Sequence, residues 1–215
     1  MRSADIVTLS RIPILALIMY LVIIQFNAWV SVILFGLIIA LDGLDGYAAV
    51  HDESKGKVSL GVYLKASVLH DAAALKTVKG FKEQIGKSTF YAPRMDIAGD
   101  RIVEYSFWAL FTFLHVLPLF VIIIVIIRHS IVDAFMANKG TSSRMKTRLA
   151  KIMYSSSVAR GEINVVKAVT FGYLILQYVA GWPSMIGYAL VAILVINIIL
   201  RGVAEVGEAL ASNRK

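Results

Sequence analysis

Residues 28–50 read AWVSVILFGLIIALDGLDGYAAV, and this stretch decides how the chain folds. It is almost wholly apolar as far as Leu41, and it reaches the roughly 20 residues that a helix needs to cross a bilayer. Asp42 and Asp45 follow directly within the same run. Charged side chains inside a membrane span are costly and usually functional. The stretch therefore predicts a membrane protein and marks two acids as candidates for its chemistry.

The composition of the whole chain agrees with a membrane location. Hydrophobic residues make up 58 % of its 215 residues and charged residues 17 %, against roughly 45–50 % and 25 % in soluble domains. This balance excludes a water-soluble globule, a disordered chain and a disulfide scaffold. The sequence contains no cysteine, so it offers no thiol chemistry and no thiolate ligand for a metal.

Five more apolar runs have the length of a transmembrane helix. The six runs together are residues 6–24, 28–50, 96–117, 119–136, 163–179 and 185–203. Pro118 separates the third run from the fourth, and a Gly-Trp-Pro sequence at residues 181–183 separates the last two. We expect an all-α integral membrane protein with six transmembrane helices, forming a single domain over residues 1–215.

Lysine and arginine set the expected orientation. The connections at residues 25–27, 115–118 and 180–184 contain neither residue type. All 22 basic residues lie at the termini, in segments 51–95 and 137–161, or in the helix ends that border them. Because cytoplasmic segments carry the positive charge, we expect both termini and both long segments in the cytoplasm. The net charge of +8 is then a topology signal, with anionic lipid headgroups and not nucleic acid as the partner.

Residues 51–91 form a long cytoplasmic segment with seven lysines. Its apolar residues recur at a loose helical spacing between Leu64 and Ile85. This spacing fits an amphipathic helix or hairpin at the membrane surface. A solvated linker fits it equally well, and the sequence leaves both alternatives open.

Four aspartates stand at regular spacings near the cytoplasmic ends of the second and third helices. Asp42 and Asp45 are three residues apart. Asp96 and Asp100 are four apart, so each pair projects from one face of its helix. The two pairs stand at one membrane face and are expected to converge, although their charges repel. A hard divalent cation such as Mg²⁺, Mn²⁺ or Ca²⁺ would relieve the repulsion. The alternative is that the four aspartates bind no ion and simply lie at helix ends exposed to solvent.

These acids carry a resemblance to a known family. The signature of the CDP-alcohol phosphotransferases resembles two runs of this chain, Asp42-Gly-Leu-Asp45-Gly46-Tyr-Ala-Ala49 and Asp96-Ile-Ala-Gly-Asp100. The family pattern is Asp-x2-Asp-Gly-x2-Ala-Arg, followed by Gly-x3-Asp-x3-Asp. The family's first helix begins with a Thr-x2-Arg sequence, which resembles Thr8-Leu-Ser-Arg11.

The chain departs from the family pattern at three places. Val50 stands where the pattern has its arginine, and Ala92 stands where it has its second glycine. Asp45 and Asp96 are 51 residues apart, so residues 51–91 contain an insertion. His51 or a lysine of the insertion is the expected substitute for the arginine as a phosphate contact. A catalytically inactive or redirected relative stays an alternative.

The resemblance implies a membrane enzyme of phospholipid biosynthesis. It would transfer the phosphatidyl-type group of a CDP-linked lipid to an acceptor alcohol and release CMP, as a homodimer at the cytoplasmic face of the plasma membrane. Mg²⁺ or Mn²⁺ would be bound by Asp42, Asp45, Asp96 and Asp100, and Asp100 would also be the catalytic base. The residues implied to bind the CDP group are Thr8, Arg11, Asp42, Gly46 and Ala49.

Arg128 is the residue from which we infer that the acceptor alcohol carries a phosphate group. It lies in the fourth helix at about the depth of the aspartates, where an unpaired guanidinium costs several kcal/mol. Asp133 is too far around the helix to pair with it, so a substrate phosphate is the expected partner, with Arg101 and Lys167 at similar depth. We expect a phosphorylated polyol, glycerol phosphate first and inositol phosphate next. Residues 127–133 and 167–171 also resemble the phosphatidylglycerophosphate synthase-like branch of the family.

Two other functions are compatible with the sequence. A cation- or proton-coupled transporter also carries acids within glycine-containing membrane helices. Here, however, the acids stand at one membrane face and the two halves show no obvious inverted repeat. A non-catalytic lipid-binding protein is the second alternative.

Overall fold

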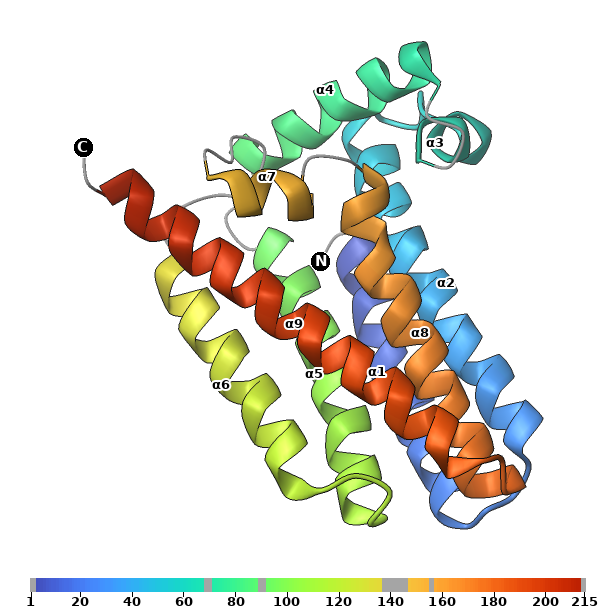
Figure 1. The fold of residues 1–215 in the computed structure, drawn as a ribbon. Coiled ribbons are helices and arrows are strands. Elements are labelled where there is room, and N and C mark those ends of the chain that lie inside the picture. The colour runs from blue at the N-terminus through green and yellow to red at the C-terminus, as the bar shows by residue number, and fades with distance from the viewer. Residues whose placement is uncertain (1–2, 68–70, 89–91, 137–146, 155–156, 214–215) are drawn as a thin grey trace. The chain divides into compact units, whose positions relative to one another are not determined.

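The computed structural model describes residues 3–67, 71–88, 92–136, 147–154 and 157–213. All regular secondary structure in these residues is helical, which confirms the predicted all-α class (Figure 1). The helices are α1 (Ser3–Ile23), α2 (Ala28–Glu53), α3 (Leu60–Ser67), α4 (Ala72–Ser88), α5 (Ala92–Phe113), α6 (Leu119–Met136), α7 (Arg148–Tyr154), α8 (Ser157–Ala180) and α9 (Ser184–Asn213).

Four of these helices are long and apolar enough to cross a membrane. They are α1, α2, residues Glu162–Ala180 of α8 and residues Ser184–Ala211 of α9. Large apolar side chains stand exposed along them, among them Ile33, Ile193 and Val203. Such side chains would be unfavourable in water but are suited to lipid. These features indicate a multi-pass membrane protein, and α5 and α6 cover the two other stretches that the sequence analysis predicted as spans.

The helices end where the sequence analysis placed breaks. Asn27 caps α2, because its side-chain oxygen accepts hydrogen bonds from the backbone nitrogens of Trp29 and Val30 at 2.9 and 3.2 Å. Gly181 follows the end of α8 with a φ of 71°, the left-handed conformation in which glycine commonly terminates a helix. The α5–α6 connection contains the predicted break at Pro118.

The chain divides into two compact units. The first consists of Met1–Leu21 and Ile33–Ser106, and the second of Val22–Val32 and Phe107–Lys215. The first unit therefore contains most of α1 and α2, all of α3 and α4, and the beginning of α5. The second contains the rest of α5 together with α6 to α9.

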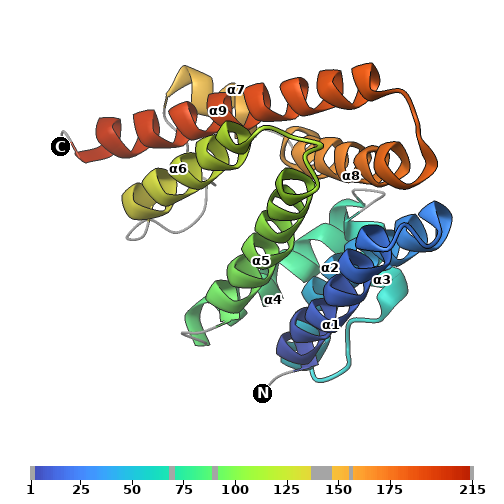
Figure 2. The same ribbon diagram turned by 90° about the horizontal axis from the view of Figure 1, so that it is seen from below.

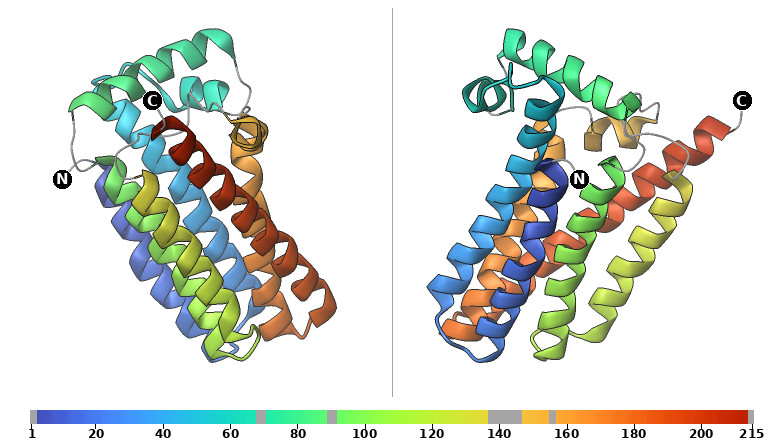
Figure 3. Two further views of the ribbon diagram at one scale, coloured as in Figure 1. Left: turned by 60° about the vertical axis from the view of Figure 1, so that its left-hand side comes forward. Right: turned by 180° about the vertical axis from the view of Figure 1, so that it is seen from behind.

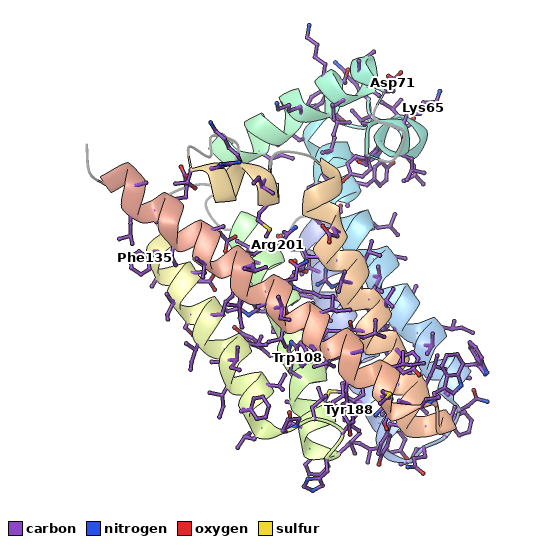
Figure 4. The ribbon with its side chains drawn as sticks, viewed as in Figure 1. Lys65, Asp71, Trp108, Phe135, Tyr188 and Arg201 are labelled. Atoms are coloured by element: carbon purple, nitrogen blue, oxygen red, sulfur yellow. The ribbon has the colours of Figure 1, made fainter. Side chains whose placement is uncertain are left out.

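In the first unit, α3 and α4 form a hairpin beyond the C-terminal end of α2 (Figure 3). We call α3 and α4 with their connections the inserted hairpin. The buried cluster that holds it to α2 consists of Val50, Val58, Tyr63, Ala66, Ala74, Val78 and Ile85. Lys65 and Asp71 lie at the end where the two helices connect (Figure 4). The segment is thus helical and uses its apolar face within the protein, and its contact with lipid stays a prediction.

In the second unit, α6 and α8 both lie along α9 (Figure 2). Aromatic rings fill part of the interior, since Phe171 of α8 stacks on Phe107 of α5 with ring centres 5.3 Å apart. At the α8–α9 connection the hydroxyl of Tyr173 donates to the backbone oxygen of Pro183 at 2.9 Å. Trp29 contacts Trp182 edge to face, with ring centres 6.4 Å apart. These contacts fix the connections at one end of the unit.

Candidate functional site

Arg11 lies at the centre of the candidate site, in the first unit. Its side chain is only 2 % exposed although it stands on the apolar helix α1. The guanidinium contacts the carboxylate of Asp42 directly and donates to Asp100 Oδ1 at 2.8 Å. It also lies 3.3 Å from Asp45 Oδ2. One side chain of α1 thus joins acids from α2 and α5, which a guanidinium can do because it carries five N–H donors.

Thr8 assists Arg11 in holding Asp45. It stands one turn before Arg11 on the same face of α1. Its hydroxyl lies 3.1 Å from Asp45 Oδ2 and 3.2 Å from the backbone oxygen of Ala4. Asp45 is buried in consequence, with its side chain 8 % exposed. Thr8 and Arg11, predicted to bind CDP, therefore contact the motif acids, and their role toward CDP stays a prediction.

Gly99 permits the close approach that brings Asp100 to Arg11. A side-chain carbon built onto Gly99 would lie 2.5 Å from Cγ2 of Thr8 and 3.5 Å from Nη2 of Arg11. Any other residue at position 99 would force the Thr8 side chain or the helices themselves to shift. The glycine next to the fourth motif acid thus has a packing function, as small residues often do between membrane helices.

The three carboxylates around Arg11 differ in exposure. The side chain of Asp42 is 39 % exposed and that of Asp100 is 52 % exposed, whereas Asp45 is turned inward. Three carboxylates share one guanidinium, so when all three are ionised the cluster carries more negative charge than Arg11 balances. Asp42 and Asp100 therefore have acceptor capacity on their exposed sides that Arg11 does not use.

The oxygen donors of this cluster suit a hard divalent cation in kind. Asp42 and Asp100 are the described residues best placed to contribute to such a site, because they combine charge with exposure. Within the described residues, however, no three His, Cys, Asp or Glu side chains are grouped as metal ligands. Asp96, the remaining predicted ligand, lies in α5 one turn before Asp100, and its side chain is outside the described part of the chain. The four-aspartate metal site stays a prediction.

Gly46 and Ala49, the other predicted CDP contacts, border the inserted hairpin. A side-chain carbon built onto Gly46 would lie 2.6 Å from the hydroxyl oxygen of Tyr63 on α3. Ala49 packs against the buried cluster of the hairpin. Val50, which stands in place of the motif arginine, is fully buried in that same cluster. The arginine is thus missing at the point where the inserted hairpin packs on α2.

His51 does not take over from the missing arginine in this structure. It stands nine residues after Asp42, two and a half helical turns, and so lies on the opposite side of α2. Its Nδ1 lies 3.2 Å from the hydroxyl of Tyr47 and 3.0 Å from the backbone oxygen of Val58. The histidine therefore connects α2 to the start of the inserted hairpin, contrary to the expectation of a phosphate contact. Lys65, a lysine of the hairpin, is exposed at its far end.

Arg128 in the second unit has a protein partner that the sequence analysis missed. Its Nη2 donates to Glu205 Oε2 of α9 at 2.8 Å, and its Nε donates to the backbone oxygen of Ile198 at 3.1 Å. Gly202 makes room for the arginine, because a side-chain carbon there would lie 2.8 Å from Cγ of Arg128. The expectation that Arg128 lacks a protein partner is therefore wrong, while its role toward an acceptor phosphate stays a prediction. Glu205 could have been found by applying the same rule on charges in apolar helices to α9.

The two other residues predicted to bind the acceptor phosphate also have protein surroundings. Arg101 of α5 lies 3.7 Å from Glu104 one turn further along the helix. Lys167 is half-buried in α8. Arg101 belongs to the first unit, whereas Arg128 and Lys167 belong to the second. An acceptor pocket formed by all three stays a prediction.

Comparison with known proteins leaves the family open. No family model matches the sequence, and no curated protein or solved structure is significantly similar to the chain. The function must therefore be inferred from the cluster around Arg11 and from the spacing of the acids that form it.

Proposed function

We propose that the chain is a CDP-alcohol phosphatidyltransferase of phospholipid biosynthesis. It transfers the phosphatidyl-type group of a CDP-linked lipid to an acceptor alcohol and releases CMP. The observation that carries this proposal is the meeting of Asp42, Asp45 and Asp100 at Arg11. These are three of the four acids in the motif that resembles the family signature, and they come from two helices that are far apart in the sequence.

The proposed arrangement in the membrane has six spans with both termini in the cytoplasm. Four candidate spans and the absence of lysine and arginine from the three short connections support it. The acids then lie at the cytoplasmic face of the plasma membrane. A lipid substrate reaches them from the bilayer, while CMP and the acceptor exchange with the cytoplasm. The chain acts as one domain and forms a homodimer in this proposal.

Mg²⁺ or Mn²⁺ is the proposed cofactor, held by Asp42, Asp45, Asp96 and Asp100. When bound, the ion neutralises the pyrophosphate charge beside the carboxylates and stabilises the charge on the leaving CMP. The excess negative charge of the cluster and the exposure of Asp42 and Asp100 support such a cofactor. Arg11 and Thr8 keep Asp45 and its neighbours in place.

Asp100 is the proposed general base. The acceptor oxygen forms a bond to the lipid-side phosphorus, the bond from that phosphorus to the CMP oxygen breaks, and the hydroxyl proton passes to a carboxylate. Asp100 suits this role because its side chain is the most exposed of the three described acids. A positioned carboxylate can take up the proton as the hydroxyl attacks. Gly99 lets it approach Arg11, which holds its other side.

The proposed acceptor is a phosphorylated polyol, with glycerol phosphate first and inositol phosphate next. Arg101, Arg128 and Lys167 are the proposed cations for its phosphate. Arginine suits a phosphate because its planar fork can donate two hydrogen bonds. Because Arg128 already pairs with Glu205, the acceptor phosphate would share the donors of this arginine with that carboxylate.

CMP release by the purified protein tests the proposed function. The protein, reconstituted with a CDP-linked diacyl or ether lipid and Mn²⁺, should release CMP only when an acceptor is present, and fastest with glycerol phosphate or inositol phosphate. No release with any acceptor would overturn the proposal. Ion flux into proteoliposomes would then indicate the transporter, and lipid binding without flux would indicate a non-catalytic relative.

A further inference from the structure

Gly46 lies at the border between two faces of α2. Residues 42, 45, 46 and 49 follow the spacing of one helix face, which carries the acids that contact Arg11. Residues 46, 47 and 50 follow the spacing of the adjoining face, which packs against the inserted hairpin. Gly46 is common to both. Whatever occupies the space over Gly46 therefore stands at the edge of the acidic site.

The hydroxyl of Tyr63 occupies that space. It lies 2.6 Å from the position of a side-chain carbon at residue 46, whereas the ring carbon that bears it lies 3.7 Å away. Tyr63 is only 8 % exposed and belongs to the buried cluster, so its ring is held firmly. The side-chain position at Gly46 is one helical turn from that of Asp42, about 5–6 Å away. A diphosphate bound at Asp42 would come within reach of this hydroxyl.

The inserted hairpin also removes the place where the motif arginine would stand. Val50 is fully buried beneath it, and the face of α2 that carries Val50 contacts the hairpin. His51 lies on the opposite side of α2 from Asp42. The Tyr63 hydroxyl is a polar group of the hairpin that reaches Gly46, at the edge of the acidic face.

We propose that Tyr63 replaces the motif arginine in binding the substrate's diphosphate group. Its hydroxyl donates a hydrogen bond to a phosphate oxygen of the CDP-linked lipid. The insertion supplies this tyrosine, and Val50, which replaces the motif arginine, packs against the insertion, so the two departures from the family pattern belong together. This inference rests on the proposed function and names a specificity residue outside the motif. A phenol is a neutral, single donor, so the site depends more on the metal ion for phosphate binding than one with an arginine.

Tyr63→Phe tests this role, with Tyr47→Phe as the matched control. Both variants lose one hydroxyl from neighbouring rings, whose centres are 5.7 Å apart. The Tyr47 hydroxyl contacts His51, away from the acids. A hydrogen bond to a charged group corresponds to about 10-fold to 100-fold in affinity. Tyr63→Phe should therefore raise the KM for the CDP-lipid and the Kd for CMP by about 10-fold or more, with kcat little changed, while Tyr47→Phe leaves both constants near wild type.

Gly46→Ala separates binding from packing. The added methyl group meets the Tyr63 hydroxyl, so this variant should lower the Tm of the detergent-solubilised protein. Phenylalanine at position 63 lacks the colliding oxygen and leaves its ring carbon at ordinary contact distance. The double variant Gly46→Ala, Tyr63→Phe should therefore recover the Tm, while its Kd for CMP stays at least as high as that of Tyr63→Phe, the variant that keeps Gly46. Recovery of both would show that Tyr63 acts only in packing and would overturn the proposal.

The outcomes also distinguish this inference from the proposed function. If wild type releases CMP and Tyr63→Phe has an unchanged KM and Kd, the role of Tyr63 is wrong and the enzyme assignment stands. If wild type neither binds CMP in the presence of Mn²⁺ nor releases it from a CDP-lipid, the proposed function and the role of Tyr63 both fail.

Discussion

Arg11 in the first unit and Arg128 in the second both stand on apolar helices but differ in their partners. Arg11 contacts Asp42, Asp45 and Asp100, whereas Arg128 pairs with Glu205 and one backbone oxygen. The pair in the second unit is balanced in charge. The cluster in the first unit has more acids than its arginine can balance. In the proposed function, the number of acids per arginine, and not burial alone, distinguishes a structural pair from a site that would take up another cation.

Exposure strengthens the difference between the two arginines. Arg128 and Glu205 are both largely buried, with 13 % and 17 % of their side chains exposed. Removing one partner of such a pair leaves a charge without its counterpart, which is strongly unfavourable. The outer sides of Asp42 and Asp100 are instead accessible, so water or a ligand can approach them. The first unit therefore combines ion pairs to Arg11 with accessible carboxylate oxygens on Asp42 and Asp100, the proposed metal ligands.

Removal of divalent cations should have the largest effect. A chelator such as EDTA should abolish CMP release, because the carboxylates alone would repel the pyrophosphate, and added Mg²⁺ or Mn²⁺ should restore it. The folded protein should survive, since Arg11 still balances part of the acidic charge. Full activity in the chelator would contradict the proposed metal cofactor. It would also contradict the inference that the excess of acids around Arg11 marks a cation site.

Asp100→Asn should have the next largest effect. The amide keeps the size and part of the hydrogen bonding but cannot take up the acceptor's proton, so kcat should fall by about 100-fold to 10,000-fold. Binding of the CDP-lipid should stay measurable. Asp42→Asn should weaken binding and turnover together, because it removes a proposed metal ligand. Near-normal turnover of Asp100→Asn would remove the base from the proposal.

The two arginines should respond differently to Mn²⁺ when each is replaced by methionine. Arg11→Met leaves Asp42, Asp45 and Asp100 to repel one another and should cost about 1–3 kcal/mol of unfolding free energy, less than for a fully buried pair because two of the acids are hydrated. Mn²⁺ should recover much of this loss by binding the folded state. Arg128→Met should lose stability that Mn²⁺ does not recover. If Mn²⁺ raised the Tm of Arg11→Met and of Arg128→Met by the same amount, the proposed difference between the two arginine sites would be wrong.

The sequence predicted the helices well because the constraint on them is local. A run of about 20 apolar residues is visible without knowledge of the rest of the chain, and helices stand at all six predicted runs. The spacing of Asp42 and Asp45 placed them on one face of their helix, and their shared position near one membrane face with Asp100 led us to expect that these acids converge; in the structure all three contact Arg11. The sequence did not decide whether residues 51–91 form an amphipathic helical segment or a solvated linker. The apolar residues of the hairpin pack in a cluster with α2, and the periodicity of one segment cannot show which other segment it packs against.

The partners of the arginines could not be read from local sequence. Glu205 is 77 residues from Arg128, and Asp100 is 89 residues from Arg11. Only the packing of α6 on α9 and of α5 on α1 brings these charges together. Tyr63 was missed for a related reason, since it belongs to the insertion and contacts the motif only through the folded hairpin.

The smallest expected effect concerns Arg128 as an acceptor contact. If its guanidinium also binds the phosphate of the acceptor, Glu205 competes with that phosphate for the same donors. Arg128→Gln should then raise the KM for glycerol phosphate severalfold, while Glu205→Gln should lower it, and neither should change the KM for the CDP-lipid. A purely structural pair would give a different pattern, because loss of either partner would lower the Tm and move the acceptor KM in the same direction. Steady-state kinetics of both variants, with Tm measured alongside, therefore decides whether the balanced pair of the second unit is only structural or also serves the reaction.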